Sequence, residues 1–133
     1  MATQIIEGWA GSLPQTQNLC SAQTGNGATT NIVDRAGRTG PALLTITTAI
    51  GATPTCTYAI EGSADGVTWF AIPYSDSATP ETISVATFVI TTAITAKKYL
   101  KAGVPWRFVR VTFSANTNVT NTVDVWQFGN WSS

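Results

Sequence analysis

The chain has 133 residues, of which 44% are hydrophobic and only 11% are charged, and its seven basic and seven acidic residues give a formal net charge of zero. This length predicts one domain. A surface that follows phosphates needs clustered positive charge, so we expect no nucleic-acid partner. The sequence contains no histidine, the commonest general base and metal ligand, and we therefore expect no catalytic residue, no metal and no cofactor.

The first residues, MATQIIEGWAGSLPQ, lack the basic and long apolar regions of a signal peptide. No run approaches the roughly 18 apolar residues that cross a bilayer. We therefore expect a chain made in the cytoplasm without a membrane anchor. Cys20 and Cys56 have no CxxC spacing, so they carry no zinc or thioredoxin-like signature, and two buried thiols or one disulfide both stay open.

Short segments of period-two alternation, separated by Gly, Pro, Asn and Asp, predict an all-β chain without a substantial helix. Residues 3–9 predict a short strand or an arm, and the polar, Gly-rich segment that follows predicts a long loop or connection up to residue 28. A strand over residues 29–33 is expected to end at the DRAGRTGP loop, where two glycines and a proline mark a turn.

Later strands are expected over residues 42–50, 56–60, 68–74, 82–92, 106–113 and 119–128, and we expect Lys97 and Lys98 in a solvated edge or loop. Seven to nine strands at spacings of about ten residues predict an antiparallel β-sandwich of immunoglobulin-like or jelly-roll type. The sandwich is expected over residues 29–133, after an arm and connection over 1–28. Trp69, Trp106 and Trp126 lie in strongly patterned strands and are predicted to be in the core.

The stretch EGSADGVTWF (residues 61–70) looks most like a motif. Asp65-Gly66 between two strands predicts a hairpin turn, because Gly tolerates positive φ and the Asp carboxylate closes the turn. Ser63 can cap the same turn. A calcium loop would need more acidic residues than Glu61 and Asp65, so we interpret the stretch as structural.

The pattern EGSADGVTWFAIP resembles the S-x-D-G-x-x-W hairpin of discoidin-like sandwich domains and of many small β-sandwich structural proteins of tailed bacteriophages. NIVDRAGRTG before the first core strand and the closing VPWRFVRVTFSANTNVTNTVDVWQFG extend this resemblance. It implies a virion protein that decorates or cements a capsid. The implied partner is the phage major capsid protein or another virion protein, and the implied oligomer is a homotrimer.

Large apolar side chains near the two ends of the chain could anchor an arm on a neighbour, and arginines of the DRAGRTGP loop could contact a shell protein. The candidate interface residues are Ile5, Ile6, Trp9, Arg35, Arg38 and Trp131. Ends that fold back on their own sandwich and a solvated loop stay open as alternatives. The competing function is a carbohydrate-binding module, with Trp9, Trp131 and Tyr74 as exposed stacking faces.

Overall fold

The computed structural model describes residues 15–35, 40–101 and 106–127. These residues form strands and no helix, which confirms the prediction of an all-β chain. The strands, in chain order, are β1 (Gln15–Gln23), β2 (Gly27–Ala28), β3 (Val33–Asp34), β4 (Ala42–Ser63), β5 (Phe70–Ala71), β6 (Tyr74–Asp76), β7 (Thr79–Ser84), β8 (Phe88–Ile90), β9 (Thr95–Leu100) and β10 (Phe108–Gln127).

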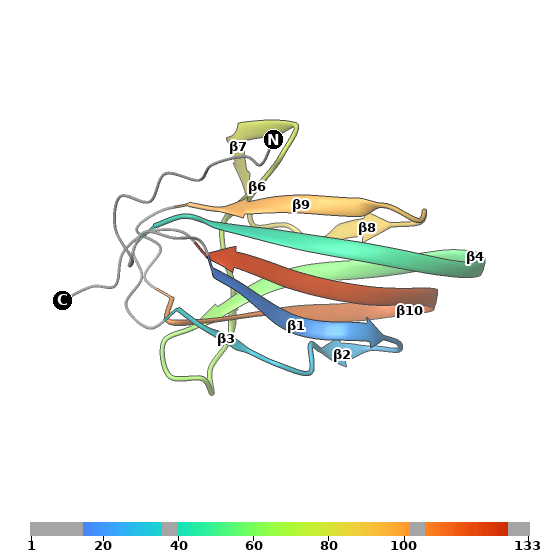
Figure 1. Ribbon diagram of the computed structural model, residues 1–133, viewed down its shortest axis with the longest axis horizontal. Helices are drawn as coiled ribbons and strands as arrows, with labels where there is room; N and C mark the ends of the chain where they lie inside the picture. The colour runs from blue at the N-terminus through green and yellow to red at the C-terminus, as the bar shows by residue number, and fades with distance from the viewer. Residues whose placement is uncertain (1–14, 36–39, 102–105, 128–133) are drawn as a thin grey trace, which may run out of the picture.

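Two long strands, β4 and β10, organise the fold. They pair antiparallel along almost their whole length, from Ala42 opposite Gln127 to Ser63 opposite Phe108. Both strands fold over at the same end of the molecule and return, as Figure 1 shows. At this end their register shifts, and Thr53, Ala115 and Asn118 have φ of 45°, 49° and 54°. Strands that change layer through such bends build the corners of sandwiches.

The fold-over creates two layers. The first contains β1, the second half of β10, the first half of β4, then β9, β6 and β7. The second contains β2 and β3 beside the first half of β10, then the second half of β4 with β5 and β8. Alternate side chains point between the layers, and Val109, Val111 and Phe113 lie in the core. Each such side chain stabilises the fold by about 1.5–3 kcal/mol.

The two long sides of the sandwich differ. On one side, residues 29–31 cross between the layers, because the Thr29 amide donates to the Val111 carbonyl and the Asn31 amide donates to the Leu19 carbonyl, each at 2.8 Å. We call this the closed side. On the opposite side, β7 pairs with β6 alone and β8 with β4 alone among the described strands. We call this the open side, and Figure 1 shows the β6–β7 hairpin projecting beyond β9 there.

Residues 15–23 form a strand, so the prediction of a loop is wrong there. Leu19 and Cys20 are buried in the core. Two hydrogen bonds also hold the strand to β10: the Asn18 side-chain amide donates to the Asp124 carboxylate at 2.8 Å, and the Ala22 main-chain amide donates to the Thr122 hydroxyl at 3.0 Å. The register also shifts twice along β1. A bulged edge strand hides the period-two pattern on which the prediction depended.

Two more expectations fail at the open side. Residues 82–92 do not form one strand, because β7 ends at Ser84 in the first layer and β8 begins at Phe88 in the second. Lys97 is exposed in β9, which the expectation of a solvated edge or loop allows, whereas Lys98 contradicts it. Lys98 is buried, because its ammonium pairs with the Asp76 carboxylate and lies 4.1 Å from the Phe88 ring centroid. The ten strands exceed the expected seven to nine because of such breaks.

Candidate interaction surface

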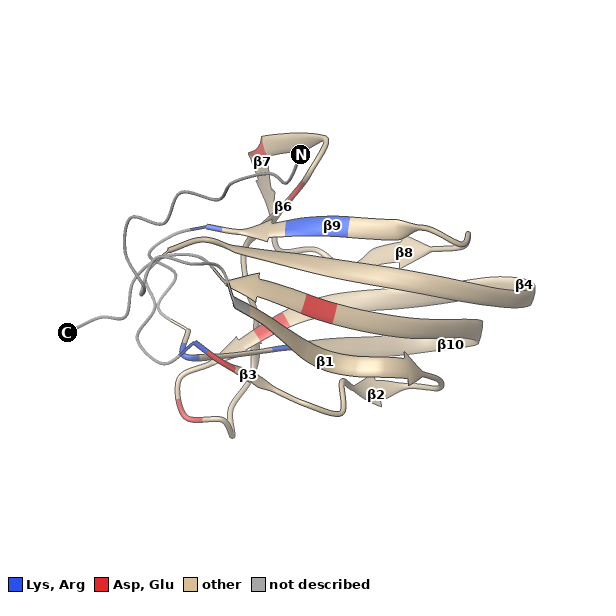
Figure 2. Ribbon diagram, in the orientation of Figure 1, with Lys and Arg blue, Asp and Glu red and all other residues tan. Residues whose placement is uncertain are grey.

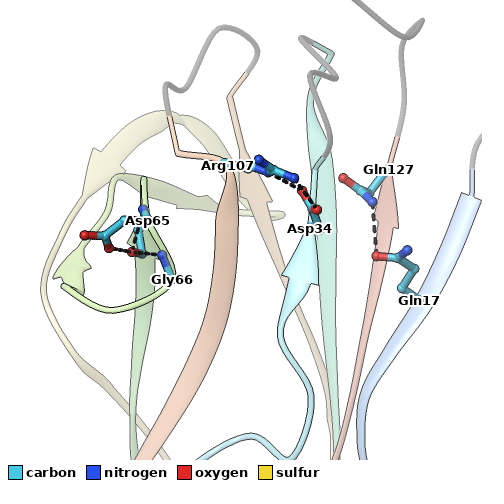
Figure 3. Close-up of polar contacts among 7 residues, drawn as sticks. Gln17, Asp34, Asp65, Gly66, Arg107 and Gln127 are labelled. Atoms are coloured by element: carbon cyan, nitrogen blue, oxygen red, sulfur yellow. Dashed lines mark hydrogen bonds and ion pairs between the residues drawn. The ribbon is translucent and has the colours of Figure 1, made fainter.

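The turn after β4 is built by its own side chains, as Figure 3 shows. The Ser63 hydroxyl accepts a hydrogen bond from the Gly66 amide at 2.8 Å, and the Asp65 carboxylate accepts from the Val67 and Thr68 amides at 2.8 and 2.9 Å. Gly66 has φ of 79°, which a residue with a side chain adopts at a cost. These donors hold the pKa of Asp65 below its ordinary value, with the Thr68 amide the largest cause. The prediction of a structural turn is confirmed.

Trp69 does not enter the core. Its ring lies 4.2 Å from the Arg110 guanidinium, whose Nε donates to the Glu61 carboxylate at 2.9 Å. The Thr112 hydroxyl donates to the same carboxylate oxygen at 2.5 Å. Glu61 and Arg110 sit opposite each other on paired strands, so this cluster ties the turn to the outer face of the second layer. Its polar groups satisfy one another, which makes it a structural feature.

Arg35 is not the exposed loop residue that the sequence predicts. Its side chain is 2% exposed and donates to the Gly40 carbonyl, so a direct contact with a shell protein is wrong for this residue. The exposed arginine beside it is Arg107, whose Nε and Nη2 donate to the two carboxylate oxygens of Asp34 at 3.1 Å each (Figure 3). The remaining candidates lie outside the described residues: Ile5, Ile6, Trp9, Arg38 and Trp131.

A polar cluster crosses the core between the layers. The Tyr58 hydroxyl donates to the Asn121 side-chain carbonyl at 2.5 Å, and the Asn121 side-chain amide lies 3.9 Å from the Cys56 sulfur. Cys20 bonds to the Asn121 main-chain carbonyl at 3.5 Å. Both cysteines are buried and free, which decides between the two alternatives for them. Burial raises the pKa of both thiols and of the Tyr58 hydroxyl, so these groups are neutral packing elements.

Exposed apolar side chains gather on the open side. Nine large hydrophobic residues are exposed in the described part of the chain, and four of them lie here: Ile83, Val85, Val89 and Ile94. Val89, at 57% exposure, and Ile94 line a hollow of about 540 Å³ between the turn of the β6–β7 hairpin, β8 and β9. Apolar side chains beside strands that lack a second neighbour are features of association surfaces.

A second apolar surface lies on the outer face of the first layer. Trp126, Leu43 and Tyr99 are direct neighbours across β10, β4 and β9, so their side chains point the same way. We call these three residues the apolar row. Trp126 is 41% exposed, which overturns its prediction as a core residue: Val125 and Gln127 take the inward positions on either side of it. Trp106 is half-buried against the core.

Figure 2 shows charged residues on β6, β7 and β9 at the open side, where Asp76, Lys97 and Lys98 line the hollow together with the apolar side chains. Tyr74 is buried, with its hydroxyl donating to the Ala86 carbonyl at 2.6 Å. The glycan-binding alternative therefore loses one of its three predicted stacking faces. Among residues 15–35, 40–101 and 106–127, no group of three or more Cys, Asp or Glu side chains could hold a metal. No helix in this part of the chain is long and apolar enough to cross a membrane.

Comparison with known proteins adds one finding. No family model matches the sequence, and no curated protein matches it either. The fold is similar to the crystal structure of the SPBc2 prophage-derived protein YomS, with a TM-score of 0.62 over 92% of this chain and 98% of that chain. The two sequences are 8% identical in that alignment, so the likeness concerns the fold: an all-β sandwich shared with a prophage-derived protein.

Two features were missed by sequence reasoning. The open side was missed because Ile83 and Val85 alternate with polar residues as core residues do, and no pattern marks a strand that lacks a second partner. The apolar row was missed because its members are far apart in sequence. The signal that could have found Trp126 is its position between Val125 and Gln127, since alternation forces neighbouring side chains to opposite faces.

Proposed function

We propose that this chain is a non-enzymatic structural protein of a bacteriophage particle, which decorates the capsid by associating with the major capsid protein. One observation carries the proposal: four of the nine large hydrophobic residues exposed in the described part of the chain lie on the open side, where β7 and β8 each have one strand neighbour. Such a surface gains free energy when a partner covers it. The virion is the location that this function requires.

Three further observations support the proposal. The chain has a formal net charge of zero, so copies and partners approach without long-range repulsion. The polar clusters in the described residues, at Asp65, Glu61 and Asn121, are satisfied internally and stabilise the fold. The fold resembles that of a prophage-derived protein, which is consistent with a phage role.

Cosedimentation with capsid shells tests the proposal. Shells are assembled from the major capsid protein encoded by the same genome and are mixed with the purified chain. We expect the wild-type chain to pellet with shells at a fixed stoichiometry. The double substitution Val89→Asp and Ile94→Asp should abolish pelleting while circular dichroism shows an unchanged fold, because it places charge on the open side.

Val67→Asp is the matched control, since Val67 is an exposed valine on the turn after β4. It should bind shells as the wild type does. Failure of the wild-type chain to pellet would contradict a capsid role, and a glycan array would then test the carbohydrate-binding alternative. If the Val67→Asp control lost as much shell binding as the double substitution, the open side would not be the specific contact.

A further inference from the structure

The apolar row stands out from the rest of the outer face on which it lies. The next positions along the same strands are polar: Asn18 and Asp124 bond to each other at 2.8 Å, and farther on Thr47 and Thr95 approach to 3.3 Å. Beside the row, Pro41, Ala42, Leu43 and Tyr99 line a shallow hollow of about 390 Å³. That volume is in the range of pockets that take a ligand or a large side chain.

The row lies where the described part of the chain begins and ends. Gln15, the first described residue, is opposite Gln127, the last one, and Thr16 is opposite Trp126. Fourteen residues precede Gln15, and the large apolar side chains among them include Ile5, Ile6 and Trp9. This apolar segment is therefore attached within one strand of an exposed apolar row.

The single chain leaves the row open, because Trp126 keeps 41% of its surface exposed. Fourteen extended residues span up to about 46–50 Å, whereas a chain of this length has a radius of gyration of roughly 14 Å. The segment is long enough to leave its own sandwich and reach another. A formal net charge of zero places no electrostatic barrier between two copies.

We propose that residues 1–14 of one copy dock on the apolar row of a second copy, with Trp9 and the two isoleucines covering Trp126, Leu43 and Tyr99. This inference rests on the proposed function as an associating structural protein, and it names the partner as another copy of the chain. Exchanged segments join copies into a closed oligomer, and the implied trimer is one such ring.

Complementation between two defective variants tests this. The first variant deletes residues 1–11 and keeps the row. The second, Trp126→Thr with Tyr99→Thr, keeps the segment and removes the row. Phe70→Thr, an exposed aromatic position away from the row, is the matched control. Masses are measured by multi-angle light scattering at two concentrations, after circular dichroism has established that each variant folds.

The wild-type chain and the Phe70→Thr control should form the same oligomer, and each defective variant alone should be a monomer. Mixed together, the two variants should form a 1:1 heterodimer, because the segment of one still meets the row of the other. Monomers in the mixture would overturn the proposal in favour of a segment docked on its own sandwich. A monomeric wild type, or an unchanged mass in either defective variant, would also overturn it.

Shell binding separates this inference from the proposed function. A deletion variant that is monomeric but still pellets with shells leaves both proposals standing. An oligomer that fails to pellet contradicts the capsid role alone. A wild-type monomer that pellets contradicts segment exchange alone.

Discussion

The closed side and the open side of the sandwich end their layers in different ways. On the closed side, residues 29–31 bond to β1 and to β10, and Leu19 of β1 is fully buried. On the open side, residues 85–87 join β7 to β8, but each of these strands pairs with one other strand among the described residues, and Val89 is 57% exposed. The difference indicates that one side contributes mainly to stability, while the other is available for association at little cost to the fold.

The largest expected effect is on the closed side. Leu19→Ala removes a fully buried side chain and should lower the free energy of unfolding by about 2–5 kcal/mol. Val89→Ala on the open side should change it by less than about 0.5 kcal/mol. Urea denaturation of both variants measures the difference, and equal losses would show that the two sides do not differ as described.

The next largest loss of stability is expected from removing the polar cluster of Tyr58 and Asn121 in the core. Asn121→Ala deprives the Tyr58 hydroxyl of its acceptor and leaves a cavity, and it should cost about 2–4 kcal/mol. Tyr58→Phe leaves the Asn121 carbonyl without its donor and should cost about 1–2 kcal/mol. Thermal unfolding measures both losses. If Tyr58→Phe lowered the stability as much as Asn121→Ala does, the loss in both variants would be due to the Tyr58 hydroxyl.

On the open side, the pair of Asp76 and Lys98 should have a smaller effect. Asp76→Ala leaves a buried ammonium without its carboxylate and should cost about 1–3 kcal/mol, less than a fully buried pair because the Asp76 side chain is 53% exposed. Adding Lys98→Met should recover part of the loss, since the unpaired charge is removed. A double variant less stable than Asp76→Ala would contradict this, and denaturant melts of all three variants decide it.

The smallest effect is expected at the Asp65 turn. Because the pKa of Asp65 is lowered in the fold, its contribution to stability is present above its ordinary pKa of 3.8 and is lost as the pH falls through the lower folded value. Asp65→Asn should flatten this acid dependence without altering the sheet. Carbon-detected NMR titration of the carboxyl group measures the shift, and titration at the ordinary value would contradict the hydrogen bonding described.

Local patterns were enough for several features and failed for others. Ser63, Asp65 and Gly66 build the predicted turn because its hydrogen bonds are made within residues 63–68. The predicted strand over residues 106–113 carries Val109, Val111 and Phe113 on one inward face, because alternation sets the face of each side chain. The burial of Lys98 could not be predicted, since it depends on the Asp76 carboxylate, which another strand brings to it.

The sequence by itself determined the all-β class, the inward faces of the long strands and the turn at Asp65, because these depend on residues close together in the chain. The fold-over of β4 and β10, the closure of one side and the exposure of the other were decided by tertiary structure. The reason is physical: strand pairing joins residues as far apart as Ala42 and Gln127. Which partner a strand receives, and whether an apolar side chain is covered, is settled only when those distant segments meet.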